Sequence, residues 1–328
     1  MHRYLFLLFA PVLLNSALAQ QGPAKKPIAL VTWFGPGTII IPNGPDWKPE
    51  QVSVYDHGKR PVLQLLNTRT SVTASFILFE NNSGQPNAQG CRKDAIDPII
   101  ENSGKLISER VDDESKDSAG NPIATTSYMT ALGDTKAKQH SIFAFVGDGK
   151  TCAEIHVSTI AGKPDEESNL RAALSEFNPK LGYEPIAQDY FLIATLLFKS
   201  SPALAAPYYK SSLDRLPTGQ SSLTTRRVIT DQLVMSLGMS GDLANSRAVA
   251  EKAIENDPAY PLNYYNLACA DAEQGKAKDA QLHLQQAFDR KANIIPGETL
   301  PDPTKDDSFL KLRKDKTFWA FVQSLSTN

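Results

Sequence analysis

The sequence has few of the residues and patterns on which metal, nucleic-acid or membrane function usually depends. Its three cysteines form no CxxC pair, so a zinc site is not indicated. The 34 basic and 36 acidic residues leave a net charge of −2, which provides no bulk attraction to nucleic acid or to an acidic membrane. Beyond the N-terminal segment, no apolar run approaches the ~18 residues of a transmembrane helix. With 41% hydrophobic residues, the 328-residue chain is predicted to be globular, with about two domains.

The N-terminal segment has the pattern of an export signal. A short basic start precedes an apolar run at 4–14, and Ala17-Leu18-Ala19 fits a small-x-small cleavage site. The run is too short to cross a bilayer, and no cysteine follows it to carry a lipid. We therefore expect a signal peptide at 1–19, a polar leader at 20–27, and a soluble chain that is exported to the periplasm or secreted.

The cysteine distribution agrees with export. Cys91 and Cys152 both lie in the N-terminal half, where an oxidising compartment would let them pair. Such a bridge would close a loop of about 60 residues and contribute about 4 kcal/mol in the chain-entropy model. Connectivity cannot be deduced from spacing, so the pair is a hypothesis. Cys269 lies in a run of small residues that suits close helix packing.

From residue 28 to about residue 160 the apolar pattern is typical of β-strands. Short runs rich in β-branched and aromatic residues are bounded by Gly, Pro and Asn. A helix-like interruption lies near Ala88–Asn102, and the charged, turn-rich stretch 108–122 predicts an exposed loop. We expect an N-terminal domain at 28–180 of the α+β class, with an antiparallel sheet and helices.

The clearest hairpin signal is Asp148-Gly149, which suits a two-residue type I′ turn. In that register Ser141 lies opposite His156. One face of the hairpin is then aliphatic, and the other carries Cys152 among aromatic and polar side chains. If Cys152 is bonded to Cys91, the preceding helix-like segment has to cover this second face, so both faces of the sheet are covered.

After residue 164 the apolar period changes to that of a helix, and the chain from about residue 183 is expected to be helical, with loops near 217–224 and 291–306. Three residue pairs recur at a spacing of 34: Leu233 and Leu267, Gly241 and Gly275, Ala253 and Ala287. Each unit is predicted to be a helix, a glycine turn and a second helix, and thirty-four residues is the tetratricopeptide period.

Residues 227–290 resemble two tetratricopeptide (TPR) repeats. The resemblance is carried by the family's packing positions, which are occupied by Tyr264, Leu267, Ala268, Gly275, Ala280 and Ala287, with Pro258 at the closing proline. The resemblance implies an all-α helical-repeat domain at 183–328, and it specifies fold better than function because the motif positions are packing positions.

Two flanking segments extend the resemblance. A first helix at 189–198 and a second at 203–217 are similar to an earlier repeat, although Pro217 and Pro258 are 41 residues apart rather than 34. The segment 306–325 resembles the terminal cap that an array needs, because its last apolar face has no following repeat.

Other features of the N-terminal half suggest a second resemblance. The segment 37–42 with Trp47, the hairpin segment 138–158 and a helix ending at Phe177 are similar to PsbP/Mog1-like α/β domains of exported proteins. This resemblance covers no family motif and assigns no activity.

One polar set could carry chemistry. In the expected hairpin, Ser141, His156 and Glu154 come within reach of one another, and Ser-His-acid sets perform nucleophilic catalysis. The sequence has no G-x-S-x-G elbow, and a serine in the middle of a strand is badly placed to attack a substrate. We therefore expect a hydrogen-bonded polar rim and no catalytic residue, metal or cofactor.

The repeats are the better functional case. By repeat position, five residues are expected on or near a concave, partner-binding face: Tyr190, Asp231, Met235, Tyr265 and Asn266. Tyr and Met supply adaptable contact area for a peptide or another chain, although each residue could equally belong to the helix–helix core. A carboxylate clamp of the family's type is not supported, because Tyr190 and Ala194 stand at positions where it needs other residues.

We therefore expect an exported, non-enzymatic adaptor or scaffold that binds a protein or peptide through the concave face of its repeats. Two alternatives stay open. The N-terminal domain could be a hydrolase or small-ligand binder that the repeats merely dock, or both parts could be structural members of an envelope assembly.

Overall fold

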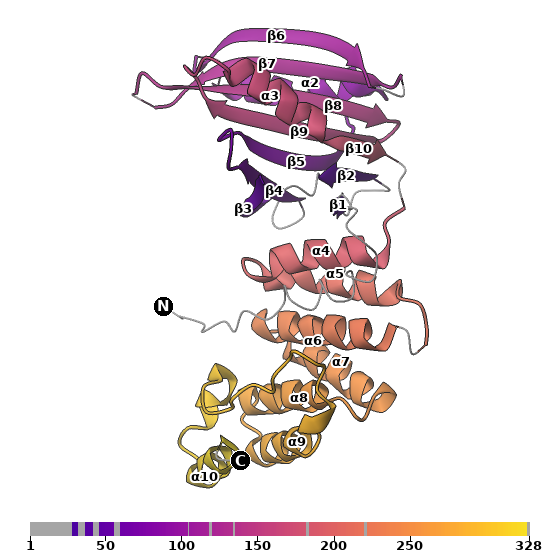
Figure 1. Cartoon of the computed structure of the whole chain (residues 1–328), viewed down its shortest axis with the longest axis vertical. Coiled ribbons are helices and arrows are strands. Elements are labelled where there is room, and N and C mark those ends of the chain that lie inside the picture. The colour runs from indigo at the N-terminus through magenta and orange to yellow at the C-terminus, as the bar shows by residue number, and fades with distance from the viewer. Residues whose placement is uncertain are drawn as a thin grey trace. The chain divides into compact units, whose positions relative to one another are not determined.

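The computed structural model describes residues 28–31, 37–41, 46–55, 60–103, 105–117, 120–133, 135–181, 184–219 and 222–326. Within these residues the chain divides into two compact units, and the division falls between Ile193 and Ala194 in the sequence (Figure 1). The expected signal peptide and leader lie outside the described residues. The expected domain limits, 28–180 and 183–328, stay a prediction.

The N-terminal unit is built on a seven-stranded antiparallel sheet with the order β3-β4-β5-β9-β8-β7-β6. Its strands are β3 (Trp47–Tyr55), β4 (Arg60–Asn67), β5 (Thr73–Glu80), β6 (Ile107–Lys116), β7 (Pro122–Ala131), β8 (Lys138–Asp148) and β9 (Thr151–Ile160). A smaller sheet has the order β1-β2-β10, from β1 (Ile28–Val31), β2 (Gly37–Ile41) and β10 (Asn178–Leu181).

Two helices cover the large sheet on opposite faces. Helix α2 (Ala88–Ser103) packs on the face that carries Phe143, Phe145 and Cys152. Helix α3 (Glu166–Glu176) lies on the other face, as Figure 1 shows, and buries Leu170 and Ala173 completely or nearly so. Successive strand residues point to opposite faces, so β8 and β9 are buried on both sides. The expected α+β architecture is confirmed.

The β8–β9 hairpin differs from its predicted register by two residues. Ser141 pairs with Ser158 and Phe143 with His156, and the turn residues are Gly149-Lys150 rather than Asp148-Gly149. Gly149 takes a φ of +59°, which a primed turn requires at its first central residue. Because side chains alternate with a period of two, a two-residue shift leaves every residue on its predicted face.

The predicted loop at 108–122 is wrong, because most of it is strand β6, which pairs antiparallel with β7. β6 lies at the edge of the sheet and is almost entirely exposed, so its many charged residues remain hydrated. A bulge between Ser108 and Val111, with Glu109 at a φ of +57°, interrupts its pairing. Charge and a bulge are the usual protection of an open edge against intermolecular pairing, and they hide the strand signal in the sequence.

The C-terminal unit is helical, as expected. Its helices are α4 (Ala187–Phe198), which spans the boundary of the two units, α5 (Pro202–Asp214), α6 (Leu223–Met239), α7 (Leu243–Asn256), α8 (Pro261–Glu273), α9 (Ala277–Asp289) and α10 (Lys316–Ser326), with two short 3-10 helices, η3 (Lys291–Asn293) and η4 (Asp307–Leu312). The expected terminal cap is therefore a 3-10 helix followed by an α-helix. None of the described helices is both long and apolar enough to cross a membrane.

The two glycine turns are equivalent corners of neighbouring units. Gly241 and Gly275 have φ values of +83° and +74°, which favour glycine. The amide after each glycine donates to the carbonyl five residues earlier, Asp242 to Leu237 and Lys276 to Asp271, at 2.9 Å in both turns. Each first helix therefore ends in the same way, and α6–α7 and α8–α9 are successive antiparallel pairs.

A buried carboxylate joins three of these helices. Asp271 of α8 is 0% exposed and forms an ion pair with Arg247 of α7. Its second oxygen lies 2.6 Å from Nδ1 of His283 on α9. Because a buried carboxylate without partners is strongly unfavourable, this contact fixes the positions of the three helices relative to one another.

Candidate functional site

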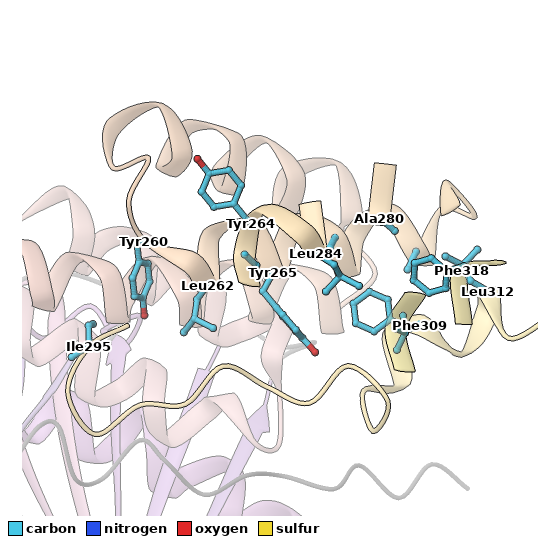
Figure 2. Close-up of a cluster of buried hydrophobic side chains, with 14 residues drawn as sticks. Tyr260, Leu262, Tyr264, Tyr265, Ala280, Leu284, Ile295, Phe309, Leu312 and Phe318 are labelled. Carbon is cyan, nitrogen blue, oxygen red and sulfur yellow. The ribbon is translucent and has the colours of Figure 1, made fainter. Parts of the chain in front are cut away.

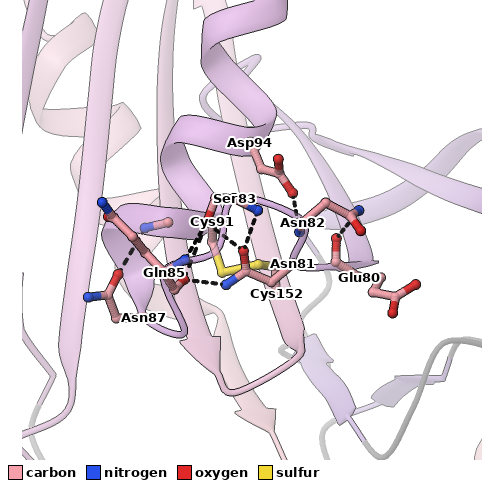
Figure 3. Close-up of a disulfide and its surroundings, with 10 residues drawn as sticks. Glu80, Asn81, Asn82, Ser83, Gln85, Asn87, Cys91, Asp94 and Cys152 are labelled. Carbon is pink, nitrogen blue, oxygen red and sulfur yellow. Dashed lines mark hydrogen bonds between the residues drawn. A yellow bond between two sulfur atoms is a disulfide. The ribbon is translucent and has the colours of Figure 1, made fainter.

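Cys91 and Cys152 form a disulfide that joins the first turn of α2 to the start of β9 (Figure 3). Both side chains are 0% exposed. The helix start is built by side-chain hydrogen bonds, among them one from the Gly90 amide to Oδ1 of Asn87 at 2.9 Å. Gly147, opposite Cys152, has no room for a Cβ, which would lie 2.8 Å from the Cys91 sulfur. Helix α2 is therefore held directly against the sheet. Cys269 is free.

The polar set of the N-terminal unit, Ser141, His156 and Glu154, is largely shielded from solvent and does not form an open site. His156 Nε2 is 3.2 Å from Ser141 Oγ, and its Nδ1 is 3.3 Å from Ser75 Oγ. Among the described residues, the ring hydrogen-bonds to these two serines and to no carboxylate. Ser141 is only 3% exposed. Burial lowers the pKa of His156 to about 4 and raises the pKa of Glu154 to about 7.

This geometry is that of a packed polar row. The His156 ring stacks on Phe143 with centroids 4.1 Å apart, which fixes the imidazole between two serine hydroxyls. A nucleophilic serine needs a base that is oriented by a third group and a path for the substrate. Here the third group is another hydroxyl, and the serine is covered. The arrangement favours the expected polar rim over a nucleophile.

In the helical unit, side chains of the two first helices, α6 and α8, meet on what we call the first-helix face. On α6 it contains Arg227, Asp231 and Met235, which share one side of the helix at a spacing of four. Asn266 of α8 donates from Nδ2 to Oδ1 of Asp231 at 2.7 Å and so ties the two helices together. Burial, reinforced by the charge of Glu298, raises the pKa of Asp231 to about 7.

The irregular segment 294–306, which we call the strap, runs along the first-helix face beside α8 (Figure 2). Tyr260 donates its hydroxyl to Oε2 of Glu298 at 2.8 Å, and Tyr265 donates to Oδ2 of Asp306 at 3.0 Å. The strap begins at Ile295, which is 4% exposed, and leads to Phe309, which is 0% exposed against the Tyr265 ring. Chain from the C-terminal segment therefore covers the α8 part of the face.

One end of the face carries a fixed cation. Arg227 forms a two-point ion pair with Asp257, with nitrogen–oxygen distances of 2.6 and 3.1 Å. Its guanidinium carbon lies 4.8 Å from the centroid of the Tyr260 ring. The positive charge lowers the pKa of Glu298, although burial is the larger effect and raises it. Tyr260 and Arg227 together form a corner that receives a carboxylate.

The structure separates the five residues predicted for the partner-binding face. Asp231 and Asn266 are brought together, and Met235 lies on the same side of α6, half-buried. Tyr190 is half-buried on α4 and belongs to the other compact unit. Tyr265 is only 2% exposed, because Phe309 and Asp306 cover it. The role of these five residues in binding a partner stays a prediction.

Sequence reasoning missed the other members of the site. Arg227, Tyr260, Glu298 and Asp306 occupy no repeat-motif position, and two of them lie in a segment predicted only as a loop. A signal was present: the strap contains three prolines and three acidic residues between 296 and 306, which is unusual for a plain connection inside a helical array. Long irregular connections are often functional.

No protein-family model and no curated protein matches the chain. Among solved structures, the TPR domain of Sgt2 from Aspergillus fumigatus is similar, with 15% identity over 44% of this chain and 84% of its own, at a TM-score of 0.31. YrrB, described as a TPR protein with an unusual peptide-binding site, is 19% identical over 46% of this chain and 66% of its own, at a TM-score of 0.30. The C-terminal TPR-containing domain of a Plasmodium falciparum FK506-binding protein is 19% identical over 41% and 91%, at 0.31.

The C-terminal half of the chain is a TPR-like array, as predicted from its 34-residue period. The assignment rests on the chain's own helix pairs and on the equivalent Gly241 and Gly275 turns. The similarity of the N-terminal half to PsbP/Mog1-like domains stays a prediction.

Proposed function

We propose that this chain is an exported adaptor that binds a protein or peptide through the first-helix face, while its N-terminal α+β unit has no catalytic role. The observation that supports the proposal is the pair of stacked repeats, in which α6 and α8 are joined by the hydrogen bond between Asn266 and Asp231. Stacked repeats of this kind generate extended binding surfaces rather than catalytic pockets.

A crosslinking pair tests the binding face. A photoreactive residue at Met235 reports on α6, and the same residue at Leu282, which is 54% exposed on α9, is the matched control on a second helix. We expect a discrete crosslinked product with one other protein from position 235 and none from position 282. Identical products from both positions would contradict a role for the first-helix face.

Export has a direct test. The mature chain, recovered from the extracytoplasmic or secreted fraction, should begin at Gln20 on N-terminal sequencing. A chain that keeps Met1 and fractionates with cytoplasmic markers would argue against export and against the environment in which the Cys91–Cys152 disulfide is stable.

The absence of nucleophilic catalysis can be tested at Ser141. This serine is 3% exposed, and burial lowers the pKa of His156, which disfavours proton uptake by the ring. We expect no reaction of Ser141 with a serine-directed phosphonate, with an acid-denatured sample as the background control. Specific labelling of Ser141 in the native chain, lost in His156→Gln, would revive the hydrolase alternative.

A further inference from the structure

The strap contacts the first-helix face as a bound peptide would, through side-chain carboxylates that accept hydrogen bonds from the face. We propose that it is an internal ligand, and that the partner segment which takes its place is an acidic stretch that brings two side-chain carboxylates to the positions of Glu298 and Asp306. This partner chemistry rests on the proposed function, because it concerns the same face.

Both receiving sites present hydrogen-bond donors to a carboxylate. At one, the Tyr260 hydroxyl donates to Glu298 while the Arg227 guanidinium stands 4.8 Å from the centre of the same ring. At the other, the Tyr265 hydroxyl donates to Asp306. Hydrogen bonds from neutral donors to ionised carboxylates are stronger than those to amides, so a neutral segment would be bound less tightly.

The strap can leave these sites without unfolding the array. Its ends are fixed by Ile295 and Phe309, both buried. The backbone hydrogen bonds described for it are local, from Glu298 to Ile295, from Lys305 to Asp302 and from Phe309 to Asp306, and Oδ1 of Asp306 also accepts from the Ser308 amide at the start of η4. Leu300 and Pro303 make the apolar contacts that a partner segment has to replace. Lifting residues 296–306 therefore breaks mainly side-chain contacts and keeps the anchors in place.

The charges around Glu298 also keep the strap exchangeable. Asp231 of α6 acts on Glu298 as a like charge, and each raises the energy of the other's ionised form. Arg227 is attractive, but it shares its charge with Asp257. Glu298 is therefore held by the Tyr260 hydroxyl, a backbone hydrogen bond with Ile295 and a partly compensated cation, while burial opposes its ionised form.

A peptide of this chain's own sequence, residues 294–309, is the probe. A tethered ligand competes at a high effective concentration, so the wild-type chain should bind the added peptide weakly. The E298Q/D306N chain should bind it at least about tenfold more tightly, since loss of one charge-assisted hydrogen bond corresponds to roughly that factor. D307N is the matched control, because Asp307 is exposed beside Asp306 and the variant should behave as wild type.

Two further measurements keep the test decisive. A probe peptide that carries E298Q/D306N itself should bind the E298Q/D306N chain about tenfold more weakly than the acidic peptide. In the Y260F chain, which only removes the donor, amide hydrogen exchange should accelerate over residues 297–300 and stay unchanged over α10. Equal binding of acidic and neutral peptides, or unchanged exchange of the strap in Y260F, would overturn the proposal.

The outcomes separate this proposal from the proposed function. If the crosslink from position 235 persists while the acidic peptide does not bind E298Q/D306N, the adaptor function stands and the internal-ligand proposal fails. If the peptide binds as expected but position 235 yields no crosslinked protein, the face recognises acidic segments, but the proposed adaptor function fails.

Discussion

Replacing both Cys91 and Cys152 by alanine should destabilise the N-terminal unit and leave the helical unit unchanged. The two cysteines are 61 residues apart in sequence, so the disulfide removes about 4 kcal/mol of loop-closure entropy from the unfolded chain. The bonded sulfurs are fully buried between α2 and the sheet, and their removal also deletes packing there. Both effects lower the free energy of unfolding.

The two units have separate fluorescent reporters. Trp47 is 8% exposed in the N-terminal unit and donates from its indole nitrogen to Glu176 at 2.9 Å, whereas Trp319 lies on α10. With the other tryptophans replaced by phenylalanine, the urea midpoint reported by Trp47 should fall by about 2 M, given slopes of about 1–3 kcal/mol per M. The midpoint reported by Trp319 should not move.

Cys269→Ala is the matched control, and it should leave the Trp47 transition in place. Thiol titration gives an independent check: the denatured, unreduced chain should expose one thiol and the reduced chain three. The reasoning would be refuted by a midpoint shift below about 0.5 M at Trp47, which corresponds to roughly 1 kcal/mol. Equal shifts at both reporters would refute the independence of the two units.

Four other changes have expected outcomes. Asp271→Asn should lower the free energy of unfolding of the helical unit by about 3 kcal/mol in urea titrations, because it removes the charge of the buried carboxylate that contacts both Arg247 and His283. The exposed Asp307→Asn should cost little, and equal effects would contradict this. Gly147→Ala should cost the N-terminal unit about 1–3 kcal/mol by overpacking against α2, and an unchanged midpoint would show that α2 can move. Burial raises the pKa of Glu154 from 4.5 to about 7, so the folded state holds this proton more tightly and stability falls as pH rises through that window; Glu154→Gln should flatten the fall. Burial lowers the pKa of His156 from 6.5 to about 4, so stability is lost as pH falls through that window, and His156→Gln should flatten this opposite slope.

The helical half could be predicted well because the residues that define its repeats occupy helix-packing positions. Small and aliphatic residues such as Ala268, Ala280 and Leu284 recur where helices touch, and each is fully buried. The glycine turns recur because only a residue without a side chain takes their positive φ freely. Spacing and residue type together fix such a structure before any long-range contact is known.

The N-terminal half shows where local patterns stop being sufficient. The hairpin glycine was identified correctly, but whether Gly149 is the first or second turn residue depends on the twist of the strands it joins. Strand β6 was missed since an edge strand with both faces in water has no apolar period to detect. The covering of the second face by α2 followed correctly from one assumed bond, between Cys91 and Cys152.

The candidate site was the least predictable part, because its surface is decided by a segment outside the repeat pattern. By repeat position Tyr265 belongs on the first-helix face, and the structure places it there, but the strap and Phe309 bury it. The role of Tyr260 and Arg227 depends on their contact with Glu298, which lies 38 residues after Tyr260 and 71 residues after Arg227 in the sequence. Repeat spacing locates a face on each helix. What that face binds depends on the hydrogen-bond donors it presents and on whether the chain's own C-terminal segment already uses them.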